Sequence, residues 1–589
     1  MAHMDQSNLE VMRHSCEHIL THSMVKLYPG IKMAMGPATN EGFYFDFEYD
    51  GKISEGDFPK IEKEMAHIVK KNLSITQKTV TLDEARSLFK GNPYKQEWLD
   101  EIEKKGGKTS VYWTGKEFVD LCSGPHITST GKVGPFKLLS VAGAYWRGDS
   151  KNKMLTRIYG TCFPTKQELD KYLWQIEEAK KRDHRKIGEA LELFTISEKV
   201  GPGLILWLPK GNIIKEELEN WVKKIEKDWG YQRVTTPVIT KAGLYYTSGH
   251  LPYYKKDMYP PMTLDDGEQY FLRPMNCPHH HMIYVSKPRS YKDLPLRLAE
   301  YGLCHRYEGS GELFGLMRVR GFAQNDAHIY CTSEQAVDEF LEVMKLHEFF
   351  YQKLGITEYY LELALRDPKN KDKYHGNDKM WEEAENLMKE AVSKTNIKMV
   401  ETKGNAAFYG PKIDFIVRSS IGREFAISTN QIDLYMGERF GLKYTDNQGL
   451  LKTPVIIHRA PLGSHERFIG FLIEHYNGAF PLWLAPVQID VLPVTDNQLE
   501  FAQKVKNHLL KTGFRVEVNT GNETLGKKIR HSILQKVPYM IIIGDTELEK
   551  SKGENLYVSV RTRMGKDLGM MDIKTFIKKL EEPIEKRPL

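Results

Sequence analysis

Two pairs of side chains that can bind metal lie near the amino end of the chain. His14 and His18 stand four residues apart in RHSCEHIL, and Cys122 and His126 share that spacing in DLCSGPHI. On a helix this spacing places both side chains on one face, although the Gly-Pro between Cys122 and His126 argues against a regular helix there. Three imidazoles and a thiolate suit a zinc ion or a hydrolytic site that orients water and moves protons. Histidines without a chemical role remain the alternative.

A second set of the same residue types is spread over the middle of the chain. Cys277 lies in FLRPMNCPHHH, His328 in AQNDAHIYC and His458 in VIIHRAPLG. One cysteine and two histidines would leave a fourth zinc position open, as a catalytic site requires. Separations of about 50 and 130 residues match no zinc motif, so the spacing alone makes this set only a hypothesis.

A glycine-rich and arginine-rich segment, CHRYEGSGELFGLMRVRGF, has the composition of a hairpin. It contains Arg306, Arg318 and Arg320 and ends at Phe322, and the later run HRAPLGSHERFIG adds Arg467. Arginine offers paired donors to phosphate, and an aromatic face can stack on a base. The segment therefore predicts a nucleotide-binding hairpin, with a solvent-exposed basic hairpin as the alternative. The sequence has no Walker lysine motif and no GxGxxG between a strand and a helix, which disfavours P-loop and Rossmann sites.

Composition places the chain among ordinary globular proteins of several domains. Its 589 residues predict three to four domains, and 41% hydrophobic with 28% charged residues exclude a largely disordered chain. The net charge of +6, from 84 basic and 78 acidic side chains, is weak evidence for a polyanionic partner. Six cysteines without an export signal predict reduced thiols in the cytoplasm. No apolar run approaches the length of a membrane span.

The elements that must position these residues fall into three blocks and a connector. Residues 5–163 alternate turn signals, short apolar runs and helices, which predicts an α+β domain. Residues 164–187 form the expected connector, a charged helix that opens with Thr165 and Glu168 as a capping box.

The second and third blocks differ in how strands and helices follow one another. Residues 188–484 lack regular alternation, which predicts a large antiparallel sheet with helices packed on it, one of them near 214–229. Residues 486–589 alternate cleanly and predict a compact α/β domain with a mostly parallel sheet. The expected strands are 487–494, 514–518, 539–543 and 556–561, and the expected helices are 496–511, 523–535 and 572–580.

Taken together, these motifs resemble the bacterial threonyl-tRNA synthetases, a family of class II aminoacyl-tRNA synthetases. PMNCP, QNDAHIYC and IIHRAPLGSHERF are close to signatures of that family, and the resemblance covers about Val11 to Leu580. It implies a multidomain fold with an N-terminal α+β editing domain, a class II catalytic core on an antiparallel sheet and a C-terminal α/β anticodon-binding domain. The segment ending at Pro237 resembles the first motif of the class, usually part of a dimer interface, so a homodimer is expected.

The resemblance implies a cytoplasmic threonine–tRNA ligase. It would activate L-threonine with ATP and Mg²⁺, transfer it to the 3′ end of tRNA(Thr), and hydrolyse mischarged Ser-tRNA(Thr) in the first block. One zinc ion per subunit, held by Cys277, His328 and His458, would coordinate the amino group and hydroxyl of threonine. Valine would leave a coordination position empty and be rejected. Serine lacks only a methyl group, worth about 1–3 kcal/mol, so a second, hydrolytic site is expected.

The resemblance also assigns roles around the zinc and the ATP. Asp326 would accept a hydrogen bond from the threonine hydroxyl, and His250, in TSGHLPYY, matches a histidine associated with transfer to the tRNA. Further substrate-pocket positions are Gln324, Tyr409, Lys412, Gln431 and Ser464. The expected ATP contacts are Arg306 to the α-phosphate, Glu308 to the adenine amino group, Phe322 stacked on the ring, Arg467 capping the adenine, and Arg318 near the phosphates. The catalytic set would be Arg306, Arg467, His250 and Gln431.

Two further sets would act on the tRNA. The editing pocket would consist of His14, His18, Lys95, Asp120, Cys122 and His126, with Lys95 and His14 handling water or protons. The family usually edits without a metal, although this ligand set could bind zinc. The anticodon contacts would be Asn522, Glu549 and Arg563, because arginine suits the paired acceptors of guanine and glutamate suits amino donors. Lys527, Lys528 and Arg561 would neutralise phosphates.

Several positions depart from the family pattern. Because His14 comes almost at the start, we expect the usual small N-terminal ubiquitin-like domain to be either naturally absent or trimmed from this sequence, and Ala426-Ile427-Ser428 stand where the family often has Gln-Cys-Gly. His279 replaces a common glycine beside Cys277, and His465 is unusual near Arg467. None of these changes removes a predicted zinc ligand, so activity is still expected.

Two other hypotheses compete with an active threonine enzyme. A catalytically inactive RNA-binding paralogue would be expected to lose some of the arginines or metal ligands that this chain retains. A class II synthetase for proline or serine would not need the Cys/His/His set together with Asp326.

Overall fold

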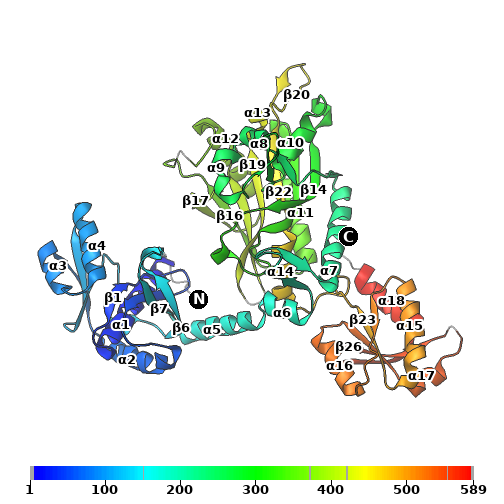
Figure 1. Cartoon of the computed structure of the whole chain (residues 1–589), viewed down its shortest axis with the longest axis horizontal. Helices are drawn as coiled ribbons and strands as arrows, with labels where there is room; N and C mark the ends of the chain where they lie inside the picture. Colours follow the sequence, from blue (N-terminus) through cyan, green and yellow to red (C-terminus); the bar gives the residue numbers. More distant parts are fainter. Residues whose placement is uncertain (1–5, 150, 371–372, 420–421, 554, 586–589) are drawn as a thin grey trace. The chain divides into compact units, whose positions relative to one another are not determined.

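A long helix divides the chain into two parts. The computed structural model describes residues 6–149, 151–370, 373–419, 422–553 and 555–585. The chain divides into two compact units, Met1–Glu177 and Glu178–Leu589, and the boundary between them lies within helix α5 (Lys166–Lys181). Figure 1 shows α5 in cyan. The Thr165 hydroxyl accepts from the Glu168 N–H at 3.2 Å, and the Glu168 carboxylate accepts from the Thr165 N–H at 3.0 Å. The predicted capping box and charged helix are therefore confirmed.

The first unit is built around α1 (Gln6–Leu27), which is buried on most of its sides. Apolar residues such as Ile19 and Met24 are buried on it, but so are His18, Thr21 and His22. A central helix that buries so many polar groups needs partners for them, and such groups gather at functional sites. The other elements are the antiparallel sheet β1-β2-β7-β6 (Lys32–Met35, Phe43–Glu48, Met154–Cys162, Phe136–Tyr145), the sheet β3-β4-β5 (Ile75–Val80, Thr109–Thr114, Phe118–Leu121), and helices α2 (Phe58–Lys70), α3 (Leu82–Leu88) and α4 (Pro93–Lys104).

An eight-stranded sheet forms the centre of the second unit (Figure 1). Its order is β10-β14-β15-β22-β19-β18-β16-β17 (Gln232–Arg233, Leu296–His305, Gly321–Cys331, Val455–Ala460, Glu424–Asp433, Lys412–Arg418, Tyr359–Leu365, Met399–Lys403). Only the two outer pairs, β10–β14 and β16–β17, are parallel. The predicted antiparallel sheet is therefore confirmed. Four helices contribute to its main apolar core: α7 (Pro209–Asp228), α11 (Ala336–Lys353), α12 (Asp378–Ser393) and α14 (His465–Tyr476).

Strand β15 shows how the sequence divides the two faces of this sheet. Its alternate residues are small or apolar except for Asn325, which donates to Glu226 at 2.9 Å, and Ala327 and Ile329 belong to the main core. The residues between them are Phe322, Gln324, Asp326, His328 and Tyr330, which therefore share the opposite face. Across the neighbouring strands His328 pairs with His458, His458 with Gln431, and Gln431 with Lys412. One row of chemically active side chains thus crosses four strands.

Smaller elements surround this sheet. α10 (Cys277–Val285) carries the PMNCPHHH motif. The remaining elements are α6 (His184–Ala190), β8 (Phe194–Ile196), β9 (Ile205–Trp207), β11 (Ile239–Lys241), α8 (Ala242–Thr247), α9 (His250–Tyr253), β12 (Met262–Thr263), β13 (Gln269–Leu272), α13 (Met436–Arg439), β20 (Tyr444–Thr445) and β21 (Leu451–Lys452).

The C-terminal α/β part has a mixed rather than a mostly parallel sheet. The strand order is β24-β23-β25-β26-β27 (Val516–Val518, Ile489–Pro493, Tyr539–Ile543, Tyr557–Thr562, Asp567–Asp572). Parallel pairing joins β24, β23 and β25, where helices α15 (Leu499–Lys511) and α16 (Leu525–Leu534) provide crossovers. β26 and β27 are antiparallel because a short turn joins them. β27 and α17 (Asp545–Lys550) were not predicted, whereas α18 (Ile573–Glu585) was. Within the described residues, no helix has the length and apolar character needed to cross a membrane.

Candidate active site

A pocket of about 690 Å³ opens on the face of the eight-stranded sheet that carries Asp326 and His328. Its walls contain all but one of the residues predicted for substrate, ATP and metal in the second unit. They are Cys277, Arg306, Glu308, Arg318, Phe322, Gln324, Asp326, His328, Tyr409, Lys412, Gln431, His458, Ser464 and Arg467. The structure thus gathers residues that lie almost two hundred positions apart in the sequence.

Three possible metal ligands meet at the inner end of this pocket. Cys277 comes from the start of α10, His328 from β15 and His458 from β22, and their ligand atoms all lie within 4.8 Å of one another. All three are buried. Burial raises the pKa of the Cys277 thiol, a cost that a bound divalent cation offsets because it stabilises the thiolate. His458 Nε2 lies 2.9 Å from the Asp433 carboxylate, so Nε2 donates there and Nδ1 keeps a free lone pair.

Asp326 is held beside this group by Asn276, the residue before Cys277. The Asn276 amide donates to Asp326 Oδ2 at 2.9 Å. This amide packs so tightly against β14 that a Cβ at Gly302 would lie 2.2 Å from its oxygen. The glycine therefore leaves space for Asn276, and Asn276 aims the Asp326 carboxylate.

Replacing this glycine tests the role of Asn276. We expect Gly302→Ala to displace the Asn276 amide, remove its bond to Asp326 and raise about tenfold the KM for threonine, the substrate that the resemblance implies, since a hydrogen bond to a charged group contributes about 1.5–3 kcal/mol. Threonine-dependent ATP–pyrophosphate exchange measures this. Gly243→Ala is the control, because a Cβ there meets no atom within 4 Å. An unchanged KM in Gly302→Ala would contradict the role of Asn276.

Three arginines crowd the outer part of the pocket. Arg306 lies over the ring of Phe322 at 5.1 Å, and Arg467 donates to the Met317 carbonyl at 3.0 Å. Burial and then the charges of Arg306 and Arg318 lower the pKa of Arg467. Such mutual repulsion among cations is relieved by a polyanion such as a triphosphate. Glu308, expected at the adenine, forms an ion pair with Arg318 at 2.9 Å.

One predicted catalytic residue does not line this pocket. His250 begins α9 and is fully buried, with Nδ1 2.7 Å from the Ser248 hydroxyl. Burial, followed by the charge of Arg306, lowers the pKa of His250 to about 3. Its imidazole is thus neutral and lies outside the pocket lining, so its role in transfer stays a prediction.

The first unit brings together all six residues of its predicted site. Cys122 Sγ lies 3.5 Å from His14 Nε2 and 3.3 Å from His126 Nε2, and the ring centroids of His18 and His126 are 4.1 Å apart. The four ligand atoms lie within 4.8 Å of one another. No helix forms at Cys122 to His126, as predicted from the Gly-Pro pair. Lys95, on α4, is buried and pairs with Asp120 of β5 at 2.6 Å.

Burial sets the protonation of this second site. It lowers the pKa values of His14, His18 and His126. At His18 the neighbouring His14 lowers the pKa further, and the charge of Lys95 adds a smaller effect in the same direction. Burial also raises the pKa of Cys122 to about 12. The site therefore offers neutral imidazoles and a neutral thiol at physiological pH, the state in which imidazole can accept a proton from water.

Three family models and a series of relatives match this chain. Residues 255–476 match the tRNA synthetase class II core domain (G, H, P, S and T), residues 488–583 the anticodon binding domain, and residues 109–159 the threonyl and alanyl tRNA synthetase second additional domain. The threonine–tRNA ligase of Geobacillus sp. (strain WCH70) is 49% identical over 546 residues, covering 92% of this chain and 84% of the relative. The chain belongs to the threonine–tRNA ligase family. It is a class II aminoacyl-tRNA synthetase with an editing domain.

Other members of the threonine–tRNA ligase family agree. The enzyme of Geobacillus kaustophilus is 47% identical, with 98% of this chain and 88% of the relative covered. A solved structure titled as the RNA binding domain of threonyl-tRNA synthetase from Cryptosporidium parvum superposes with a TM-score of 0.64 at 36% identity. That match covers 68% of this chain and 98% of the other. The putative threonyl-tRNA synthetase of Aeropyrum pernix gives a TM-score of 0.59 at 29% identity, covering 69% and 97%. The comparisons give no support to an inactive paralogue.

Two departures from the usual pattern of the threonine–tRNA ligases have structural explanations. His465 lies 3.0 Å from Glu219 of α7 and stacks on Tyr301 at 4.6 Å, so it joins α14 to its neighbours. Ser428 turns its hydroxyl away from the pocket, toward Tyr351 and His347 at 3.0 Å. Nothing in the structure explains His279, whose ring nitrogens have no hydrogen-bond partner.

The predicted tRNA-contacting residues of this ligase differ in exposure. Asn522 and Glu549 are exposed, and Arg563 is half-buried, with Nη1 donating to the Phe480 carbonyl at 2.8 Å. The phosphate role proposed for Lys528 is wrong. Its side chain is 3% exposed and donates to the Pro493 carbonyl at 3.0 Å, so its charge is used inside the domain.

Several supporting residues escaped the sequence analysis. They are Arg273, Asn276, His280, Glu300 and Asp433, all buried around the metal-ligand group. A signal existed for two of them, because Asn276 and His280 lie inside the PMNCPHHH motif. Asp433 and Glu300 lie on separate strands, and only strand pairing brings them near.

Proposed function

We propose that the pocket of the second unit forms threonyl-adenylate with one zinc ion held by Cys277, His328 and His458. The convergence of these three ligand atoms within 4.8 Å, beside the Asp326 carboxylate, carries this proposal. When bound, the zinc acts as a Lewis acid that accepts the amino group and hydroxyl of threonine. Cys277, His328 and His458 supply three ligands, which leaves room for substrate atoms, as a catalytic zinc site requires.

Asp326 provides a second contact that recognises the hydroxyl of threonine. Its carboxylate, oriented by Asn276, accepts the hydrogen bond that threonine can donate and valine cannot. A site built to bind a hydroxyl rejects a substrate without one strongly, because its buried polar groups are then left unpaired. Gln431, whose amide oxygen accepts from Tyr409, and Lys412, paired with Asp414, complete the proposed walls of the threonine site.

ATP is proposed to bind in the outer part of the pocket, with Mg²⁺. Arg306 holds the α-phosphate, Arg318 the remaining phosphates, and Arg467 covers the adenine, which stacks on Phe322. Glu308 exchanges its ion pair with Arg318 for the adenine amino group. The fixed positive charges stabilise the charge that develops on the α-phosphate as the threonine carboxylate attacks it and displaces pyrophosphate.

The site of the first unit is proposed to hydrolyse Ser-tRNA(Thr). A neutral His14 accepts a proton from water, the water attacks the ester carbonyl, and the proton passes to the terminal ribose oxygen of the tRNA as serine is released. Lys95, fixed by Asp120, supplies a positive charge for the developing oxyanion. This division of work suits the chemistry, because the first site cannot separate serine from threonine by one methyl group.

The proposed partners are tRNA(Thr), bound through Asn522, Glu549 and Arg563, and a second copy of the chain. Apolar side chains at Ile239 and Met262 are 46% and 43% exposed on strands close to the segment ending at Pro237, which supports a dimer there. Sedimentation of the purified protein tests this, and a monomer at micromolar concentration would contradict it. The proposed compartment is the cytoplasm.

Arg563 gives a direct test of tRNA recognition. We expect Arg563→Ala to lower the rate of tRNA charging about tenfold or more while leaving adenylate formation unchanged, since a bidentate base contact contributes about 1–3 kcal/mol. Charging and pyrophosphate exchange are measured side by side. Arg530→Ala, an exposed position on α16, serves as the control. An equal loss of both activities would contradict the anticodon role.

The central experiment is ATP–pyrophosphate exchange with each of the twenty amino acids, with and without a zinc chelator. Threonine should support rapid exchange, serine some and valine little, and removal of zinc should abolish it. Exchange that survives complete removal of the metal would overturn the proposal that zinc recognises the hydroxyl of threonine.

A further inference from the structure

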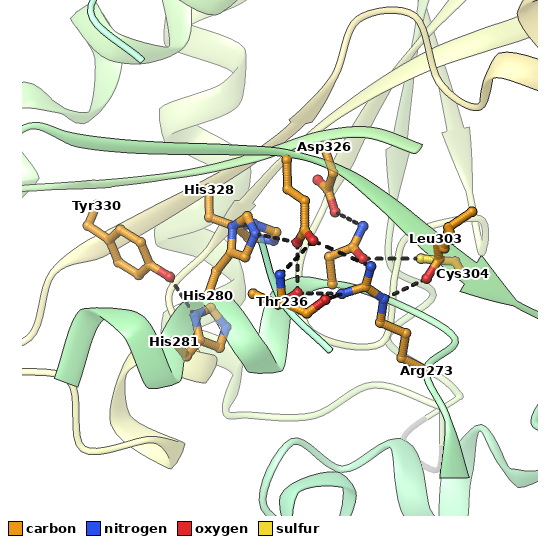
Figure 2. A network of polar contacts seen from close by, with 11 residues as sticks. Thr236, Arg273, His280, His281, Leu303, Cys304, Asp326, His328 and Tyr330 are labelled. Atoms are coloured by element: carbon orange, nitrogen blue, oxygen red, sulfur yellow. Dashed lines mark hydrogen bonds and ion pairs between the residues drawn. The ribbon is translucent and has the colours of Figure 1, made fainter. Parts of the chain in front are cut away.

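A continuous chain of buried hydrogen bonds leads from Arg273 to the metal-ligand histidine His328 (Figure 2). Arg273 donates to the Thr236 hydroxyl, which lies 2.8 Å from Glu300 Oε2. Glu300 Oε2 is also 3.1 Å from His280 Nε2, and His280 Nδ1 is 2.9 Å from His328 Nδ1. All five side chains belong to buried residues. Figure 2 shows His280 on its helix beside His328 on the sheet.

The donor at one end of this chain determines the direction of every bond in it. Arginine has only donors, so the Thr236 oxygen accepts from Arg273 and its own proton points to Glu300. The Thr236 N–H also donates to Glu300, at 2.9 Å. Glu300 is therefore an acceptor throughout, and His280 must carry its proton on Nε2.

The same logic continues to the metal site. A His328 that binds zinc through Nε2 carries its proton on Nδ1, and this N–H donates to His280 Nδ1, the nitrogen that does not face Glu300. His328 then has its free lone pair on Nε2, the nitrogen that is not used by His280. His458 follows the same pattern, since Asp433 occupies its Nε2 and leaves Nδ1 free.

The charge of Glu300 is balanced within this network. The Arg273 guanidinium lies 3.4 Å from Glu300 and compensates its negative charge. Burial alone would raise the pKa of Glu300, but hydrogen bonds from His280 and Thr236 and the charge of Arg273 outweigh it and lower the pKa to about 2. The carboxylate is therefore a hydrogen-bond acceptor for both Thr236 and His280.

We propose that Glu300 and His280 are positioning residues that set the tautomer and the ring orientation of His328 for zinc. The inference rests on the proposed zinc site and adds the residues that determine which ring nitrogen of His328 binds the metal. Groups behind a metal-binding histidine raise its basicity and fix its ring, and their loss typically costs about 10–100-fold in metal affinity.

The isosteric substitution Glu300→Gln should reverse the direction of the hydrogen bonds between residue 300 and His328. In Glu300→Gln the amide oxygen remains on the Thr236 N–H and Arg273, so the NH₂ group faces His280 Nε2. His280 then shifts its proton to Nδ1 and confronts His328 with a second N–H. We expect zinc affinity, measured by chelator competition, to fall about 10–100-fold. In the cobalt-substituted protein, the absorption bands of the metal should shift.

Glu474 offers a matched control in the same unit. It is a buried carboxylate that lies between a histidine and an arginine, 2.8 Å from His184 Nδ1 and 2.9 Å from Arg423 Nη1. No metal-ligand group adjoins it among the described residues. Glu474→Gln should lower the unfolding temperature by a similar amount as Glu300→Gln, with unchanged zinc affinity and cobalt spectrum.

A second variant covers the case in which Glu300→Gln fails to fold. His280→Leu keeps the ion pair between Glu300 and Arg273 but removes both hydrogen bonds of the imidazole, to Glu300 and to His328, so zinc affinity should fall as well. If wild-type protein binds one zinc that Cys277→Ser removes, yet both folded variants keep wild-type zinc affinity, the positioning role is wrong. If wild-type protein binds no zinc at Cys277, the proposed function itself fails.

Discussion

Cys277→Ser should yield a folded protein that has lost both its zinc and its threonine activation. Serine keeps the shape of the side chain but is a poor zinc ligand at neutral pH, and only His328 and His458 would remain. Metal stabilisation of substrate charge is worth several kcal/mol, so threonine-dependent exchange should fall about a thousandfold or more. Elemental analysis and pyrophosphate exchange on one preparation measure both losses.

Cys331→Ser separates the loss of a ligand from the loss of a buried thiol. Cys331 ends β15, the strand that carries His328, and its buried thiol donates a hydrogen bond to the Val455 carbonyl without joining the metal-ligand group. This control should keep its zinc and its exchange activity. Zinc retained at wild-type stoichiometry in Cys277→Ser would remove Cys277 from the ligand set.

A double substitution in the first unit should abolish proofreading without affecting activation. His14→Ala with His18→Ala removes two of the neutral imidazoles around Cys122, and general base catalysis is worth about 10²–10⁴-fold. Hydrolysis of preformed Ser-tRNA(Thr) should fall by that factor, and the mischarged product should accumulate. Threonine-dependent exchange should be unchanged.

His22→Ala provides the control on the same helix. His22 lies one turn beyond His18, is buried, and stacks on Phe118 at 5.0 Å without joining the ligand group. Its loss should lower stability but leave Ser-tRNA(Thr) hydrolysis close to that of the wild type. Unchanged serine clearance in the double variant would place hydrolysis elsewhere.

Local sequence signals predicted local structure well. The capping box of Thr165 and Glu168 and the spacing of His14 and His18 each depend on residues within one turn, and the structure contains both helices. The edge of the C-terminal sheet was harder, because β27 is short and half-exposed and gives no clear apolar pattern. The number of parallel pairs in that sheet depends on which strands become neighbours, which local periodicity does not encode.

The candidate site could be predicted only through resemblance to a family. Gaps of about 50 and 130 residues between ligands carry no geometric meaning along the chain. They acquire it in the sheet, where His328 lies directly opposite His458. His250 was placed at the reaction by a matching motif alone, and because it lies outside the pocket lining its role in transfer stays a prediction. The phosphate role expected for Lys528 rested on its positive charge alone, and the structure buries that side chain.

The pairing of β15 with β22 also determines when, during synthesis, the chain can first bind a metal ion at the proposed site. Cys277 and His328 leave the ribosome long before His458, and at about 5–20 residues per second the delay from Cys277 to His458 is on the order of ten seconds or more. During that interval no three-ligand site exists, because β22 has not yet joined the sheet. The proposed zinc ion would therefore be bound only by the nearly finished chain, so under this proposal a shortage of zinc yields full-length chains that cannot activate threonine.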